Sequence, residues 1–175
     1  PGLNNKTVIL VDDLIRTGMA EQAGDLAQGG GSMYSHALAA LVLTEAYAMT
    51  HDKWLMGPAQ LSINHIVYAQ DPVGGGWRYA PRTPGDTSVV GWQLMALKSG
   101  HMAYLNVPPA TIQGSIKFLD SVSAESGAKY GYTGPGGGQV ADDLGQLLAV
   151  GAGGVGPLLR LGDAAGGDEF HRLGD

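Results

Sequence analysis

Apolar side chains recur every three or four positions in four segments of the chain, which is the spacing of a helix with one buried face. Ser32 and Asp86 stand just before two of these segments, where a side-chain oxygen can cap free backbone amides. Pro108-Pro109 precedes the last segment and suits a helix start. No segment sustains the alternation of a strand. The pattern predicts an all-α fold with helices at about residues 34–49, 58–70, 87–103 and 109–122.

The chain also resembles itself at a displacement of 53 positions, the distance from Ser35 to Ser88. Residue type is kept at positions spread over the whole unit, which favours about three copies of one helix–loop–helix repeat in residues 1–139. Helical pairs that cannot bury both faces alone must stack on their neighbours. The matching pairs are Leu10 and Ile63, Leu14 and Val67, Ile63 and Ile116, Ile66 and Leu119, Gly74 and Gly127, Trp77 and Tyr130, and Tyr79 and Tyr132.

Composition narrows the classes of function. With 175 residues, 44% of them hydrophobic, the chain can form one domain with a sizeable core. Ten basic against sixteen acidic residues give a net charge of −6, which argues against a nucleic-acid partner. The absence of cysteine excludes disulfides, thiolate zinc sites and thiol nucleophiles, and the five histidines show no metal-ligand spacing. We therefore predict neither a metal nor a cofactor.

The sequence also bears on localisation. No apolar run reaches the roughly 18 residues that a membrane-spanning helix needs. The first residues lack the basic start and apolar stretch of a signal peptide. We expect a protein of the cytoplasm or of a membrane surface, without a transmembrane segment.

One loop resembles a known family motif. The sequence Gln70-Asp71-Pro72-Val73-Gly74-Gly75-Gly76-Trp77 resembles the QW motif of squalene-hopene cyclases and related prenyltransferase repeats. Residues 33–38 and 85–93 around it are similar to bacterial squalene-cyclase-like repeat proteins, and the resemblance covers roughly residues 20–139. It implies an α/α toroid around a central cavity that takes a polyprenyl or triterpene chain. It also implies a structural, fastening role for Gln70, Gly74 and Trp77. Three copies cannot close the ring, so we expect a fragment of a longer protein.

The resemblance is weaker at the catalytic position. Family cyclases protonate an alkene with an acid from an Asp-x-Asp-Asp-Thr motif, and the matching stretch here is Thr83-Pro84-Gly85-Asp86-Thr87. Gly85 stands where the family places its proton donor. Asp86 is the candidate catalytic acid, with a helix N-cap as its structural alternative. Tyr34, His36 and Trp92 are candidates for cavity-facing side chains, although His36 also fits a buried histidine with satisfied hydrogen bonds.

Two hypotheses of function follow from these residues. The first is a terpene-cyclase-like protein, of the isomerase type if it is an enzyme, that binds a polyprenyl or triterpene chain. The second is a non-catalytic α/α repeat scaffold for a protein or a peptide. The residue at the family's proton-donor position distinguishes the two hypotheses. Glycine at this position, Gly85, favours a chain that does not catalyse cyclisation.

Two local motifs suggest other functions. Residues 8–18 resemble the phosphoribosyl-pyrophosphate loop of phosphoribosyltransferases, but the match of Leu10 and Leu14 to the helical repeat favours a helix there. Residues 151–156 satisfy the Gly-x-Gly-x-x-Gly pattern of dinucleotide-binding sites. Pro157 follows at once and the remaining chain is too short for that fold, so we reject a dinucleotide site.

Residues 140–175 form a glycine-rich segment that departs from the repeat. A helix start resembling Asp86-Thr87-Ser88-Val89 is due there, yet the chain reads Ala141-Asp142-Asp143-Leu144-Gly145. Codons for those five residues, read one base later, can encode Pro-Thr-Thr-Ser-Val. Our hypothesis is a frameshifted or truncated C-terminus that packs poorly, and the nucleotide sequence tests it.

Overall fold

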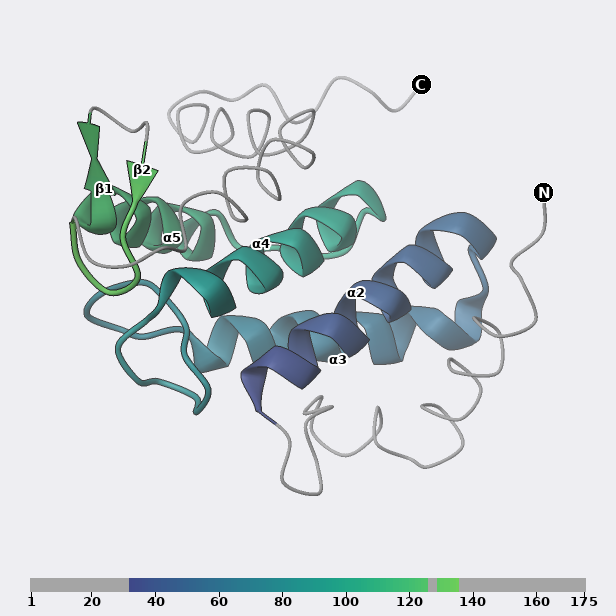
Figure 1. Cartoon of the computed structure of the whole chain (residues 1–175). Coiled ribbons are helices and arrows are strands. Elements are labelled where there is room, and N and C mark those ends of the chain that lie inside the picture. Colours follow the sequence, from purple (N-terminus) through teal and green to yellow (C-terminus); the bar gives the residue numbers. More distant parts are fainter. Residues whose placement is uncertain (1–31, 126–128, 136–175) are drawn as a thin grey trace.

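The computed structural model describes residues 32–125 and 129–135, and this part of the chain is mostly helical (Figure 1). Its helices are α2 (Met33–Thr50), α3 (Lys53–Ala69), α4 (Thr87–Met102) and α5 (Pro109–Val122). Two short antiparallel strands, β1 (Ser123–Ala124) and β2 (Lys129–Tyr130), follow α5. The all-α class is therefore confirmed. The predictions for residues 8–18, 140–175 and 151–156 lie outside the described residues.

Three of the four predicted helix starts are confirmed. The Ser32 side chain accepts a hydrogen bond from the amide of Tyr34, and Asp86 accepts one from Val89. Pro109 occupies the first position of α5, where no backbone donor is needed.

The start of α3 was predicted wrongly. This helix begins at Lys53 rather than near Pro58, which lies inside it. The Asp52 carboxylate caps the helix by accepting from the amide of Trp54 at 3.0 Å. Pro58 deprives the carbonyl of Trp54 of its helical donor, but that residue is on the surface, so water can replace the lost bond.

The helices form two layers. Helices α2 and α4 run side by side in the same direction and pack most extensively on each other (Figure 1). Helix α3 runs back across both of them, and α5 returns against α4. The core lies between the layers, and its large, fully buried aliphatic side chains are Leu43, Ile63, Ile66, Val89, Val90, Leu97 and Val122.

The loops after α3 and α5 repeat one backbone contact. After α3, the amide of Asp71 donates to the carbonyl of Gly76 at 2.8 Å. Ala124 and Lys129, each 53 positions later, are partners in the β1–β2 pair. The backbone pairing that follows α3 therefore recurs after α5 at the interval that the sequence comparison found.

Two tyrosines in corresponding places also meet. The hydroxyl groups of Tyr79 and Tyr132, 53 residues apart, lie 3.2 Å from each other. The carbonyl of Tyr79 accepts from the amide of Met33 at the start of α2, and that of Tyr132 accepts from Thr87 at the start of α4. Each loop thus holds the first turn of one helix of the α2–α4 layer. The toroid itself stays a prediction.

Candidate functional site

Trp77 anchors the loop that follows α3. Its side chain is completely buried, and its indole Nε1 donates to the carbonyl of Ile66 at 2.8 Å. A buried indole needs such a partner, because an unpaired N–H in the core costs free energy. Trp77 therefore fixes the loop to the last turns of α3.

Gln70 ties the same loop to the next helix. Its amide Nε2 donates to the carbonyl of Gly75 at 2.7 Å and to that of Thr111, in the first turn of α5, at 2.8 Å. The backbones come so close here that a Cβ on Gly75 would overlap the carbonyl of Gly114. Gly75 also has a φ of +80°, which favours glycine. Gly74 donates its amide to the Asp71 carboxylate at 2.8 Å and completes the turn.

Gly85 occupies a position with no room for a side chain. A Cβ there would lie 2.7 Å from the Cα of Gly76 and 2.9 Å from the amide nitrogen of Trp77. Both are backbone atoms, so an acidic residue at position 85 would require the two loop segments to separate. Glycine at this position is explained by packing.

Asp86 is completely buried at the start of α4. Its Oδ1 accepts from the amide of Val89 at 3.0 Å and from the hydroxyl of Ser88 at 2.6 Å. Its Oδ2 lies 3.8 Å from Nε of Arg78. Oδ1 therefore acts as a hydrogen-bond acceptor that caps α4, whereas an acid that protonates an alkene must present a proton to its substrate.

Tyr132 lies close to Tyr79 and Asp86, and the three side chains form one polar cluster. Its hydrogen bond with Tyr79, partial burial and the negative charge of Asp86 raise its pKa to about 12. All three effects favour the neutral phenol. The contact between the hydroxyl groups of Tyr79 and Tyr132 therefore links the loops after α3 and α5.

Tyr34 and Trp92 lie together near the starts of α2 and α4. The Tyr34 ring centroid is 6.2 Å from that of Trp92 and 6.4 Å from that of Tyr79, which lies nearly parallel to it. Tyr34 and Trp92 are half-buried. The structure therefore brings two of the three predicted cavity-facing side chains into one aromatic cluster.

His36 is placed elsewhere. It is completely buried, and its Nε2 lies 3.0 Å from the carbonyl oxygen of Ser62 in α3. Its ring centroid is 4.6 Å from that of His65, also in α3. His36 therefore faces α3, in the buried and hydrogen-bonded position that was its structural alternative in the sequence analysis.

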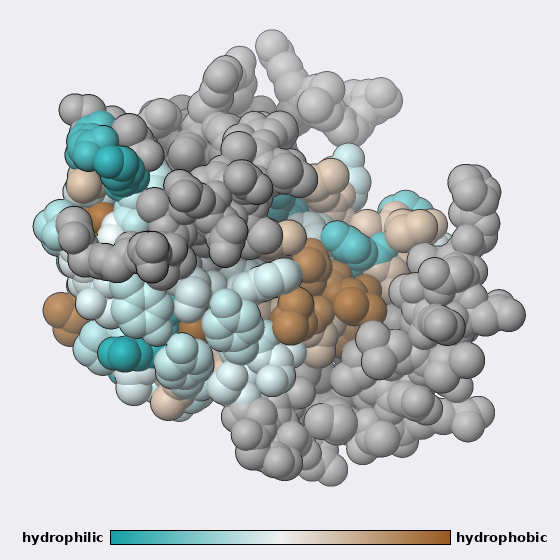
Figure 2. Space-filling model, viewed as in Figure 1, coloured by the Kyte–Doolittle hydropathy of each residue, from teal (hydrophilic) through white to brown (hydrophobic). Residues whose placement is uncertain are grey.

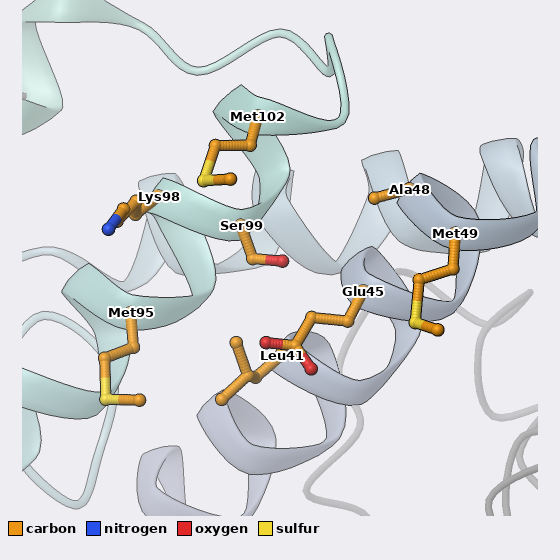
Figure 3. Close-up of a pocket in the computed structure, with 8 residues that line it drawn as sticks. All are labelled: Leu41, Glu45, Ala48, Met49, Met95, Lys98, Ser99 and Met102. Atoms are coloured by element: carbon orange, nitrogen blue, oxygen red, sulfur yellow. The ribbon is translucent and has the colours of Figure 1, made fainter. Parts of the chain in front are cut away.

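A groove between α2 and α4, which sequence analysis missed, lies further along the same layer. Figure 2 shows apolar side chains gathered over these helices, and Figure 3 shows the groove between them. Its volume is about 360 Å³, within the usual range for small-molecule sites. Its lining is mainly apolar and includes three methionines, whose flexible thioethers adapt to an irregular ligand. The lining residues are Leu41, Glu45, Ala48, Met49, Met95, Lys98, Ser99 and Met102.

The groove could have been found from spacing. Leu41, Glu45 and Met49 recur every four residues, and Met95, Ser99 and Met102 recur at four and three. Each set lies on one helix face. What the pattern does not reveal is that the two faces border the same groove, because this depends on how α2 packs beside α4.

Some other kinds of site are absent from the described part of the chain. Within residues 32–125 and 129–135, no group of three or more His, Cys, Asp or Glu side chains could hold a metal ion. No helix in these ranges has the length and apolar character needed to cross a bilayer. Comparisons with protein-family models, with curated proteins and with solved structures find no match to this chain.

Proposed function

We propose that this chain is a squalene-cyclase-like α/α repeat protein that binds the hydrocarbon chain of a polyprenyl or triterpene ligand and does not cyclise it. The observation that carries the proposal is the methionine-lined groove between α2 and α4. Burial of apolar ligand surface against this lining supplies the main driving force for binding.

The toroid architecture belongs to the same proposal. In a toroid, inner helices run parallel to one another and outer helices return behind them. The parallel pair α2 and α4, with α3 and α5 behind them, is arranged as two such units would be. The 53-residue interval between Tyr79 and Tyr132 and the contacts of Gln70 and Trp77 support this interpretation.

The absence of catalysis is proposed from the geometry at the start of α4. A side chain at Gly85 would overlap backbone atoms of the neighbouring loop. Asp86 is buried as a helix cap, with Ser88 and Val89 as its hydrogen-bond donors. These contacts favour a ligand-binding role over an isomerase.

A binding titration tests the proposal. Farnesol should displace the apolar dye nile red from the purified chain with a saturable midpoint. Met95→Gln places an amide in the groove and should weaken farnesol binding by roughly tenfold, because the amide must be desolvated. Met56→Gln is the matched control, since Met56 is exposed on α3 and does not line the groove. Equal binding by both variants would contradict the proposal.

The scaffold hypothesis has one observation in its favour. Met49 and Met102 are more than half exposed, and methionine-rich grooves also bind the apolar face of a peptide helix. The same titration with an amphipathic peptide in place of farnesol separates the two functions. Displacement of nile red by the peptide alone would favour the scaffold.

A further inference from the structure

We propose that Met49 and Met102 form a methionine-oxidation site that closes the groove to hydrocarbon ligands. The inference rests on the proposed function, because it concerns control of the same groove. The modification is conversion of the two thioethers to sulfoxides by hydrogen peroxide or another peroxide.

Met49 and Met102 are both exposed to solvent and both line the groove. Met49 is 62% exposed and Met102 is 66% exposed, so a dissolved peroxide can reach both sulfur atoms. They come from different helices, α2 and α4, and both line the groove (Figure 3). Met33 is only 2% exposed and is protected in the core. Met56 is 52% exposed but lies outside the groove. It therefore serves as a control for a methionine that a peroxide can reach but that does not contact a ligand in the groove.

The reaction needs no further cofactor. The sulfur lone pair attacks one peroxide oxygen, the O–O bond breaks, and the other oxygen leaves as water after proton transfer. The thioether sulfur is oxidised by two electrons and the peroxide is reduced by two. Methionine sulfoxide reductases reverse the step, so the modification can act as a switch.

Oxidation changes the chemistry of the groove. A sulfoxide oxygen is a strong hydrogen-bond acceptor that water solvates in the empty groove. A hydrocarbon chain would strip that water and offer no donor in return, which costs free energy. Two sulfoxides on opposite sides of the groove should therefore weaken hydrocarbon binding by tenfold or more.

Peptide mapping tests the modification directly. The folded chain is treated with increasing hydrogen peroxide, and each methionine is followed separately by mass spectrometry. Met49, Met102 and Met56 should oxidise together, well before Met33. Protection of Met49 and Met102 at a dose that oxidises Met56 would overturn the proposal.

Farnesol titration of the reduced and oxidised chains tests the consequence. Oxidation should weaken binding at least tenfold in the wild type and in Met56→Leu, and reductase treatment should restore it. In the double variant Met49→Leu and Met102→Leu, the affinity is measured before and after the same treatment, and oxidation should weaken it much less than in the wild type, whatever its value before treatment. Unchanged affinity of the oxidised wild type would overturn the inference and leave the proposed function intact. Failure of the reduced wild type to bind farnesol would instead overturn the proposed function, and the switch with it.

Discussion

The side-chain amide of Gln70 and the carbonyl of Thr111 meet at 2.8 Å and join the end of α3 to the first turn of α5. The same amide nitrogen binds the carbonyl of Gly75, so one side chain holds both the loop and the neighbouring helix. The contact bridges residues 41 apart in sequence. It therefore stabilises the tertiary arrangement rather than either helix alone.

Gln70→Glu should destabilise this connection between α3 and α5. The carboxylate has no N–H to donate, so the carbonyls of Gly75 and Thr111 would each face an oxygen. The free energy of unfolding should fall by about 1–3 kcal/mol, as it does when buried acceptors lose their donor. Urea denaturation measures the change. Gln60→Glu is the matched control, because Gln60 makes similar contacts at an exposed site and should lose less.

Trp77→Ala should cost about 3–5 kcal/mol, because it removes a completely buried aromatic side chain and leaves a cavity. Thermal and urea denaturation measure the loss. Trp54→Ala provides the comparison, since Trp54 is 84% exposed and its removal should change stability by no more than about 0.5 kcal/mol. Similar losses in the two variants would refute the fastening role of Trp77.

Substitutions of Asp86 should affect folding and not chemistry. Asp86→Ala removes the cap of α4 and should cost about 0.5–2 kcal/mol, whereas Asp86→Asn keeps an acceptor for the amide of Val89 and should cost less. Squalene incubated with the wild-type chain should be recovered unchanged by gas chromatography. A cyclised product that disappears in Asp86→Asn would show that Asp86 is a catalytic acid after all.

Tyr132 should make stability fall at alkaline pH. Its pKa is raised from 10.0 to about 12 in the folded chain, so the folded state holds its proton where the unfolded state has lost it. The contribution is complete below about pH 10 and is lost as pH rises towards about 12. Urea midpoints measured across this window should fall less steeply in Tyr132→Phe than in the wild type. Equal slopes would show that the phenol of Tyr132 is not coupled to folding.

Local sequence signals were sufficient for much of the fold. The caps at Ser32 and Asp86 lie next to the helices that they start, so the sequence alone identifies them. The start of α3 was missed because Pro58 suggested a boundary that the cap at Asp52 overrides. The interval between Tyr79 and Tyr132 was visible because both loops keep the same residue type.

The site was harder to predict because it depends on distant contacts. The partner of His36 is the carbonyl of Ser62, and nothing near His36 in sequence indicates it. Met49 and Met102 line one groove only because α2 and α4 pack side by side. The sequence alone also did not explain why position 85 is glycine. The backbone of Gly76, which leaves no room for a side chain there, belongs to another part of the loop.

Photolabelling of the purified chain with a farnesyl probe that carries a diazirine tests most directly whether the groove binds a hydrocarbon chain. We expect mass spectrometry to find the crosslinks on the groove-lining segments, residues 41–49 of α2 and 95–102 of α4. Excess farnesol should suppress these crosslinks. Labelling that farnesol does not suppress, or that falls mainly on exposed side chains outside the groove such as Trp54, would show that the groove is not a hydrocarbon-binding site.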